Sequence, residues 1–352
     1  MTILVTGGAG FIGSNFIIDW ISKNDEKVVN VDSLTYAGNL QNLKTVESNS
    51  NYLFVKQNIL NKKEISHLLI THKPRYIINF AAESHVDRSI HSPDEFIQTN
   101  ILGTYSLLEV IRNFWMSMAV DAKNDFRFLH VSTDEVYGSL DSTEKPFTEL
   151  NRYKPNSPYS ASKASSDHLV RAYYKTYGLP VLTTNCSNNY GPFQFPEKLI
   201  PLVIYNAITG KDIPIYGDGK QIRDWLYVTD HCSAIRKVLR EGKVGDIYNI
   251  GGLNEIANID IVGLLCEILD EAIPKANGKS YKSQIIFVQD RLGHDTRYAI
   301  DASKIKNNLN WHPLETFETG ITKTVNWYLQ NQDWVKDITS GEYRSWVEKN
   351  YS

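Results

Sequence analysis

The first 22 residues contain the feature that most restricts how this chain can fold. An apolar run over 3–6 leads directly into the glycine-rich string GGAGFIG at 7–13, and a helical pattern follows over 11–22. Glycines at this spacing permit a tight turn and let the backbone approach a pyrophosphate, which the N-terminus of the next helix can bind. This order of strand, turn and helix predicts a dinucleotide-binding unit. The residues expected at the cofactor are Gly7, Gly10, Phe11, Ile12 and Gly13.

Short apolar runs alternate with helical patterns along the first half of the chain. Nearly continuous apolar strands separated by helices predict a parallel sheet buried on both faces, which is a doubly wound α/β fold of the Rossmann type. We expect strands over 3–6, 28–32, 52–55, 76–80, 128–132 and 181–185, with helices near 11–22, 62–71, 93–118 and 159–177.

Composition and charge exclude several classes of protein. The chain has 352 residues, enough for roughly two domains, and its 37 Lys and Arg against 40 Asp and Glu give a net charge of −3. A nucleic-acid-binding protein would carry a basic excess. There is neither a long apolar run nor a basic region followed by a cleavable apolar segment at the N-terminus, so we expect no membrane span and no signal peptide. Three widely spaced cysteines favour reduced thiols and a cytoplasmic location.

An acidic residue follows the glycine string at the distance that dinucleotide-binding folds require. Asp32 ends the second expected strand, 19 residues after Gly13. A carboxylate there can accept hydrogen bonds from the adenosine ribose and would repel a 2′-phosphate, which favours NAD over NADP. The structural alternative, an Asp that only caps a turn, does not account for both features together.

The alternation of strands and helices becomes less regular after about residue 190, where Gly and Pro mark loops. We expect 1–190 plus about 225–252 to form the NAD-binding Rossmann domain, because 246–250 resembles a strand that rejoins the first sheet. About 191–224 plus 253–352 would form a smaller C-terminal α/β domain that binds the substrate.

Tyr159 and Lys163 form a Y-x-x-x-K pattern at the start of an expected helix. Residues four apart share a helical face, so the phenol and the ammonium can point the same way. A nearby ammonium and a positively charged nicotinamide are expected to lower the tyrosine pKa from its usual value of about 10. An isolated pair of this kind is more often an exposed helical pair. After a dinucleotide fold, with Thr133 at the end of a strand, it predicts a base that acts on a sugar hydroxyl.

Two adjacent carboxyl groups, Asp134 and Glu135, follow Thr133. Like charges at a substrate-facing strand end cost stability unless one group is a protonated acid and the other a base, as the elimination of water requires. We therefore expect burial and Glu135 to raise the pKa of Asp134. The non-functional alternative is a pair of solvated carboxylates in a loop.

This combination resembles the extended short-chain dehydrogenase/reductase family, whose members act largely on nucleotide sugars. The resemblance covers essentially the whole chain. The Asp-Glu pair is similar to that of the dTDP-glucose 4,6-dehydratases, whereas related epimerases generally have small residues there and GDP-mannose dehydratases pair a hydroxyl residue with Glu. Four further stretches match the same enzymes: 81–89 (AAESHVDRS), 185–192 (NCSNNYGP), 221–228 (QIRDWLYV) and 290–295 (DRLGHD).

The resemblance implies a lyase reaction that converts dTDP-glucose to dTDP-4-keto-6-deoxyglucose and water. Thr133 would hydrogen-bond the reacting hydroxyl, and Tyr159 would deprotonate it as C4 hydride passes to NAD. Lys163 would tune the tyrosine and hold the nicotinamide ribose. Glu135 would take the C5 proton while Asp134 protonates the departing C6 hydroxyl, before hydride returns to C6. NAD, regenerated in each turnover, would be tightly bound, and the product could lead to rhamnose or to other deoxy sugars.

The resemblance also assigns binding residues. Arg223 and Arg291 are the expected diphosphate partners, because a guanidinium can bind phosphate oxygens bidentately. The histidines show no zinc-ligand spacing, so no metal is expected. Besides the glycine turn, Tyr159 and Lys163, the expected cofactor contacts are Asp32, Ser33, Leu34, Thr35, Asn58, Ile59, Phe80, Ala81, Ala82, Ser84, Thr99 and Asn189. The expected substrate contacts are Ser84, Thr133, Asn188, Lys198, Leu199, Pro214, Ile215, Tyr216, Arg223, Asn258, Asp290, Arg291 and His294.

Two residues depart from the family's pattern. Asn58 stands where the family usually has an Asp that accepts from the adenine amino group, and the Asn58 carbonyl can accept the same bond. Leu292 stands where Pro is usual, which removes no chemical group. Family members are usually homodimers joined by a four-helix bundle, for which the helices near 93–118 and 159–177 are candidates. The aromatic residues of 333–352 suggest that this tail docks on the body of the protein.

Two alternatives remain open. The chain could be another nucleotide-sugar enzyme, such as an epimerase, a decarboxylase or a dehydratase of a UDP- or GDP-sugar. The Asp134–Glu135 pair weighs against the first two, but residue chemistry does not separate thymine from uracil. The chain could instead be a non-catalytic NAD-binding scaffold, because fold does not imply function. The intact Tyr159, Lys163, Asp134 and Glu135 weigh against that reading.

Overall fold

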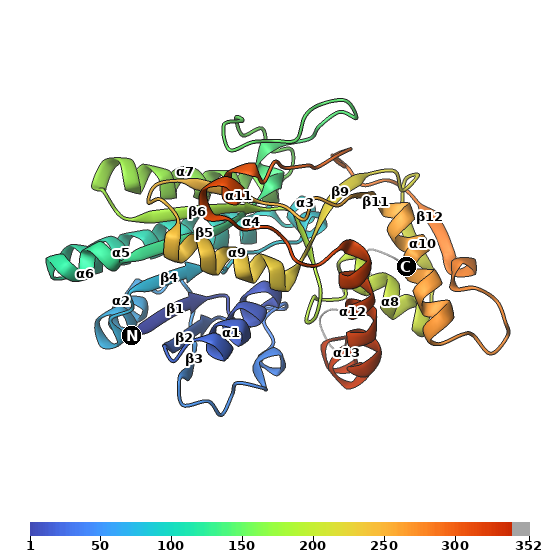
Figure 1. Ribbon diagram of the computed structural model, residues 1–352, viewed down its shortest axis with the longest axis horizontal. Helices are drawn as coiled ribbons and strands as arrows, with labels where there is room; N and C mark the ends of the chain where they lie inside the picture. Colours follow the sequence, from blue (N-terminus) through green and yellow to red (C-terminus); the bar gives the residue numbers. More distant parts are fainter. Residues whose placement is uncertain (340–352) are drawn as a thin grey trace.

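A seven-stranded sheet forms the centre of the larger part of the molecule (Figure 1). The computed structural model describes residues 1–339; of the tail at 333–352, residues 340–352 lie outside the described part. The strand order is β10-β6-β5-β4-β1-β2-β3, and every neighbouring pair is parallel. The strands are β1 (Thr2–Thr6), β2 (Lys27–Asp32), β3 (Tyr52–Lys56), β4 (Tyr76–Asn79), β5 (Arg127–Thr133), β6 (Val181–Cys186) and β10 (Ile247–Ile250).

The strands are apolar because both faces of the sheet are covered by helices. Successive residues alternate between two buried clusters: Ile3 and Val5 pack with α1, α9 and α11, whereas Leu4 packs with α2, α5 and α7. The doubly wound Rossmann-type architecture is thus confirmed, and the strand expected at 246–250 does pair with β6. The covering helices are α1 (Phe11–Lys23), α9 (Val228–Glu241), α11 (Ser303–Leu309), α2 (Lys62–His72), α5 (Thr104–Ser117) and α7 (Pro158–Tyr177).

The helix expected near 93–118 is found without a break from Pro93 to Ser117, but it is not uniform. It consists of α4 (Pro93–Phe96), the π-helical turn η2 (Ile97–Gly103) and α5. The side chain of Asn100 in η2 accepts from the backbone N–H of Glu83 (2.9 Å) and donates to its carbonyl (2.9 Å) and to Ser162 Oγ (2.8 Å). These bonds tie the wide turn to the loop after β4, and π-helical turns of this kind are frequent at functional sites.

The smaller part of the molecule has its own hydrophobic cluster. It contains a three-stranded sheet in the order β11-β9-β7 and a parallel pair of β12 and β8. We propose the two-domain division expected from the sequence on the basis of this separate core. Its strands are β7 (Asn188–Tyr190), β8 (Ile213–Tyr216), β9 (Ile222–Tyr227), β11 (Glu255–Ala257) and β12 (Ile285–Val288), and its helices are α8 (Leu199–Ile208), α10 (Asn258–Ala272), α12 (Phe317–Gln330) and α13 (Gln332–Thr339).

Short elements complete the described chain. Among residues 1–339, no helix is both long and apolar enough to cross a membrane. The three cysteines are buried and form no disulfide. The remaining helical turns are η1 (Leu40–Leu43), α3 (Val86–His91), α6 (Val120–Asp125), η3 (Asp134–Tyr137) and η4 (Tyr281–Gln284).

Candidate active site

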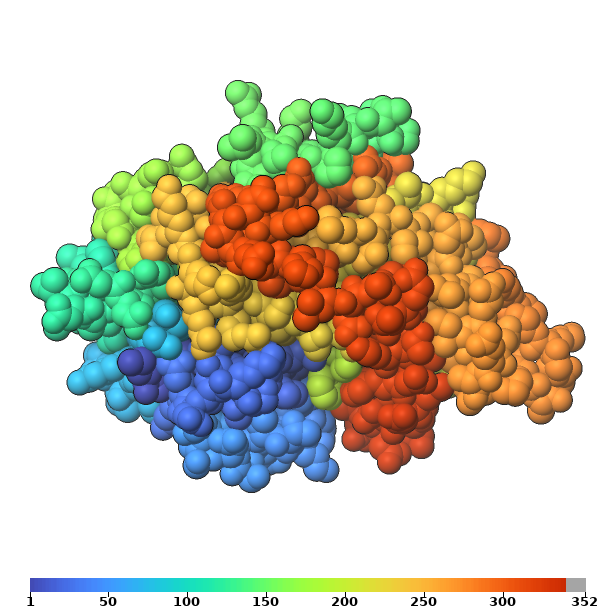
Figure 2. Space-filling model, in the orientation of Figure 1, coloured from blue at the N-terminus to red at the C-terminus, as the bar shows by residue number. Residues whose placement is uncertain are grey.

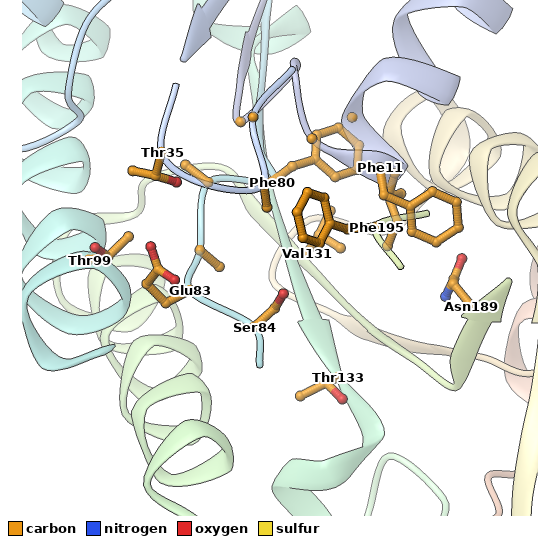
Figure 3. A pocket seen from close by; sticks show the side chains of 18 of the residues that line it. Phe11, Thr35, Phe80, Glu83, Ser84, Thr99, Val131, Thr133, Asn189 and Phe195 are labelled. Atoms are coloured by element: carbon orange, nitrogen blue, oxygen red, sulfur yellow. The ribbon is translucent and has the colours of Figure 1, made fainter. Parts of the chain in front are cut away.

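A cavity of about 300 Å³ lies where β1, β2, β4, β5 and β6 end, the edge at which parallel α/β sheets bind their ligands. Figure 3 shows Thr35, Glu83 and Thr99 on one side of this space, Phe11 and Asn189 on the other, and Thr133 at the end of its strand. A second cavity of about 170 Å³ adjoins it. The residues that line both are Glu135, Asn188, Asn189, Gln194, Glu197 and Lys198.

The glycine turn after β1 forms one wall of the first cavity. Gly7 has a φ of +68°, and a Cβ there would lie 2.5 Å from the backbone N of Ala81. A Cβ on Gly13 would lie 2.3 Å from the Gly7 carbonyl oxygen, whereas one on Gly10 would meet nothing closer than 3.3 Å. The turn is therefore closed on its protein side and open towards the cavity, as a pyrophosphate-binding turn requires.

Asp32 is held by backbone donors on both of its oxygens. Oδ2 accepts from the N–H of Ala9 (2.9 Å) and Oδ1 from that of Leu34 (2.8 Å). Burial raises the pKa of Asp32, and these two bonds oppose that rise. Each oxygen keeps further acceptor capacity for ribose hydroxyls, so turn and carboxylate together fit NAD. Apart from Leu34, whose side chain is absent from the lining, every expected cofactor residue lines the first cavity.

Tyr159 and Lys163 face the same cavity from the first turns of α7. The helix begins sharply because Ser157 and Ser160 form a capping box and Pro158 occupies the first turn. The Lys163 ammonium is buried and donates to the carbonyl of Val131 at 2.8 Å. The sequence therefore places the pair on one face of the helix, as expected.

The expected lowering of the Tyr159 pKa is not found in the protein alone. Burial raises this pKa well above its usual value, and the Glu135 carboxylate adds to the rise, while a hydrogen bond with Thr133 acts in the opposite direction. Burial also lowers the pKa of Lys163. The helical spacing did not reveal that a carboxylate from η3 lies close enough to oppose the ammonium.

The two adjacent carboxyl groups occupy different electrostatic environments. Burial, then the charges of Glu135 and Asp224, raise the pKa of Asp134 well above its usual value, which confirms the expectation. Asp134 Oδ1 accepts from Thr133 Oγ1 at 3.4 Å, whereas Oδ2 is buried without a hydrogen-bond partner among the described residues. Burial also raises the pKa of Glu135, but the cations Lys198, Arg291 and Arg223 oppose this rise. Asp134 is therefore suited to stay protonated and act as the acid, and Glu135 to be ionised and act as the base.

Arg223 and Arg291 line the second cavity and are fixed by neighbouring groups. Arg223 donates to the carbonyl of Asp295 at 2.9 Å and stacks over the Tyr298 ring, and Arg291 donates to Asp87 at 3.1 Å. The other expected substrate residues in this cavity are Asn188, Lys198, Leu199, Pro214, Ile215, Tyr216, Asn258 and His294.

Three expected substrate residues lie elsewhere. Ser84 and Thr133 line the first cavity rather than the second. Asp290 lines neither: it accepts from His294 Nδ1 at 2.6 Å and from Gln221 Nε2 at 3.2 Å, so it orients His294 from behind. Its position beside His294 in one matched motif could not show which of the two faces the cavity.

Several lining residues were not predicted. Phe193, Phe195 and Glu197 follow the matched stretch 185–192 directly, so that stretch was the available signal. Glu197 accepts from the Tyr36 hydroxyl at 3.0 Å, and burial raises the pKa of Glu197 to about 7. Tyr298, in the second cavity, belongs to no recognisable motif.

The described residues also define what the site lacks. Within 1–339, no group of three or more His, Cys, Asp or Glu side chains could hold a metal ion.

Comparisons with known proteins agree with this geometry. A family model described as GDP-mannose 4,6 dehydratase matches residues 4–324. A dTDP-glucose 4,6-dehydratase of Xanthomonas campestris is 59% identical over 343 residues, 97% of each chain. The crystal structure of a dTDP-glucose 4,6-dehydratase of Bacillus anthracis with NAD is 48% identical, with a TM-score of 0.84 over 96% of this chain and 99% of that one. One from Streptomyces venezuelae with NAD and TYD is 42% identical, with a TM-score of 0.88 over 96% and 100%. The chain belongs to the dTDP-glucose 4,6-dehydratase family of extended short-chain dehydrogenases/reductases.

Proposed function

We propose that this protein is an NAD-dependent hydro-lyase that converts dTDP-glucose to dTDP-4-keto-6-deoxyglucose and water. The observation that carries the proposal is the contrast between Asp134 and Glu135. Burial raises the pKa of both groups; neighbouring negative charge adds to the rise at Asp134, whereas three cations oppose it at Glu135. One buried acid and one buried base side by side are what the removal of water from adjacent carbons requires.

The two adjoining cavities suit the two ligands of this reaction. The first fits NAD through the glycine turn and Asp32, and the second has Arg223 and Arg291 for the diphosphate of the nucleotide sugar. The names of the relatives support thymine as the base. Glu135 and Asn188 line both cavities, so the sugar would extend between them. Bound NAD would accept hydride from C4 and return it to C6.

Tyr159 would remove the proton of the C4 hydroxyl, and Thr133 would orient that hydroxyl. Lys163, fixed by the Val131 carbonyl, would place its positive charge near the phenol. The ketone at C4 then acidifies the C5 proton, which lies beyond the reach of a carboxylate base in an ordinary sugar. Glu135 takes this proton while Asp134 donates its own to the C6 hydroxyl, and water leaves. Glu135 afterwards returns a proton to C5. Tyr159 releases the C4 hydroxyl proton to solvent and Asp134 regains one, so that both groups end as they began.

The test is incubation of the purified holoenzyme with dTDP-glucose, with UDP-glucose and GDP-mannose in parallel. We expect the alkali-induced absorbance of a 4-keto-6-deoxy sugar with dTDP-glucose alone, without any added reductant. A matching signal with UDP-glucose or GDP-mannose would correct the base preference. If folded protein that retains NAD forms no product from any of the three sugars, the dehydratase proposal is wrong and the non-catalytic NAD-binding scaffold is favoured.

We also propose a homodimer that pairs α5 and α7 of each subunit in a four-helix bundle. This surface exposes Leu102 in η2 and Tyr105 in α5, at 40% and 39%, and Tyr177 at the end of α7 at 45%. Apolar side chains exposed together are typical of an interface. We expect light scattering to give twice the chain mass, and Leu102→Glu to give a monomer. Ile70→Glu, on an exposed position of α2, should stay dimeric; a monomeric parent protein would refute the proposal.

We further propose that the protein works in the cytoplasm, because its three buried cysteines carry no disulfide. Cell fractionation followed by the dehydratase assay tests this location. The ketone left at C4 makes the product suitable for a later epimerisation or reduction, as the synthesis of rhamnose and other deoxy sugars requires.

A further inference from the structure

We propose that Trp334 is a positioning residue that joins the two walls of the NAD cavity and slows the release of the cofactor. Trp334 lies in α13, and Figures 1 and 2 show the red C-terminal helices beside the blue N-terminal part of the chain. Neither sequence motif nor cavity lining singles this residue out. The proposal rests on NAD binding and not on the sugar reaction.

The first wall is the glycine turn, which a chain of hydrogen bonds connects to α13. The carbonyl of Ala9 accepts from the Asn39 N–H (2.9 Å) and from Asn42 Nδ2 (3.0 Å). Asn42 Oδ1 accepts in turn from Trp334 Nε1 at 2.8 Å. Asn42 is only 2% exposed, so its amide depends on these partners. Since Asp32 accepts from the Ala9 N–H, both peptide groups of Ala9 are fixed within the turn.

The second wall is the loop at 192–195, which follows β7 and lines the same cavity through Phe193. Phe193 adopts a left-handed backbone conformation with a φ of +69°, which a side chain rarely adopts unless its surroundings hold it. Its ring centroid lies 4.8 Å from that of Trp327 and 6.0 Å from that of Trp334, and the two indole rings are 5.0 Å apart. Nearby, the Tyr328 hydroxyl donates to the Gln194 carbonyl.

Trp334 therefore connects to one wall through the bond from its N–H to Asn42, and its ring packs against the other. The glycine turn and Phe193 both line the cofactor cavity, and the proposal requires these walls to separate when a dinucleotide bound along the glycine turn leaves. A contact that forms only when the two walls are together favours that arrangement and so lowers the fraction of time for which they are apart. Loss of the indole N–H removes one such contact and also leaves Asn42 Oδ1 buried without a donor. The effect should appear in the rate of NAD release before it appears in catalysis.

The test compares exchange of radiolabelled NAD from the holoenzyme into excess unlabelled NAD, with no sugar present. Trp334→Phe keeps an aromatic ring near Phe193 but loses the N–H, and we expect it to release NAD about 3–10-fold faster. Excess NAD should restore its turnover. Trp311→Phe is the matched control, because Trp311 Nε1 donates to Ser233 Oγ over the same 2.8 Å but lies outside the cavity lining. It should lower thermal stability and leave NAD exchange unchanged.

A double substitution tests whether Trp334 acts through Asn42. We expect Trp334→Phe combined with Asn42→Ala to exchange NAD no faster than Asn42→Ala alone, because both remove the same chain of bonds. Parent-like exchange in Trp334→Phe would overturn the proposal, and so would equal acceleration in Trp311→Phe. If Asn42→Ala does not fold, the comparison of the two tryptophan variants decides. Since no sugar is used, failure of the dehydratase assignment would leave this result intact.

Discussion

Tyr159→Phe is expected to lower kcat with dTDP-glucose about 10²–10⁴-fold while the protein still binds NAD. The variant keeps the ring that packs edge-on against Phe96, with centroids 6.2 Å apart, and loses only the group that removes the C4 proton. Because every later step needs the ketone, no 4-keto-6-deoxy product should form at a comparable rate. Turnover by the alkali-absorbance assay and NAD content after gel filtration are the two measurements.

Tyr153→Phe is the matched control for this substitution. The Tyr153 hydroxyl accepts from Asn185 Nδ2 at 3.1 Å, and burial raises the pKa of Tyr153 as it does that of Tyr159. Tyr153 lies outside the lining of both cavities, so its loss should cost about 1 kcal/mol of stability and little turnover. Near-normal turnover in Tyr159→Phe would show that another group removes the C4 proton.

The sequence predicts best those elements whose apolar pattern matches their burial in the structure. The apolar strands are buried on both faces, so their composition identifies them, and 246–250 could be placed in the sheet although it is remote in sequence. The helix expected near 93–118 is present, but its π-helical section was not foreseen, because helical periodicity does not distinguish an α-turn from a π-turn. The hydrogen bonds of Asn100 to Glu83, a residue of another loop, select the π-turn.

The candidate site shows the same division between local and long-range causes. Glycine spacing, Asp32 and the Tyr159–Lys163 pair are local patterns, and the structure gathers them in one cavity. Phe193 enters that wall through packing against α12 and α13, more than a hundred residues away, which local sequence does not encode. The pKa of Tyr159 in the protein alone likewise depends on long-range contacts, since burial raises it and Glu135, from a different element, adds to the rise.

Asp134→Asn and Glu135→Gln are each expected to lower kcat about 10²–10⁴-fold, but for different reasons that isotope exchange separates. Asp134→Asn removes the proton that the C6 hydroxyl needs, so elimination stops after the ketone has formed. Glu135 can still take and return the C5 proton in that variant. In deuterium oxide, dTDP-glucose recovered from Asp134→Asn should therefore carry deuterium at C5. Substrate recovered from Glu135→Gln should not, because the base itself is missing.

The pH dependence of the parent enzyme follows from the same assignment. Glu135 must be ionised, so kcat should fall as the pH drops through its raised pKa; Asp134 must be protonated, so kcat should fall again as the pH rises through its more strongly raised pKa. Such a profile reports the coupled pair, whereas the exchange experiment assigns each member. Deuterium at C5 with Glu135→Gln and none with Asp134→Asn would reverse the two roles. Exchange in neither variant would mean that the two carboxyl groups act only together, with neither able to move the C5 proton alone.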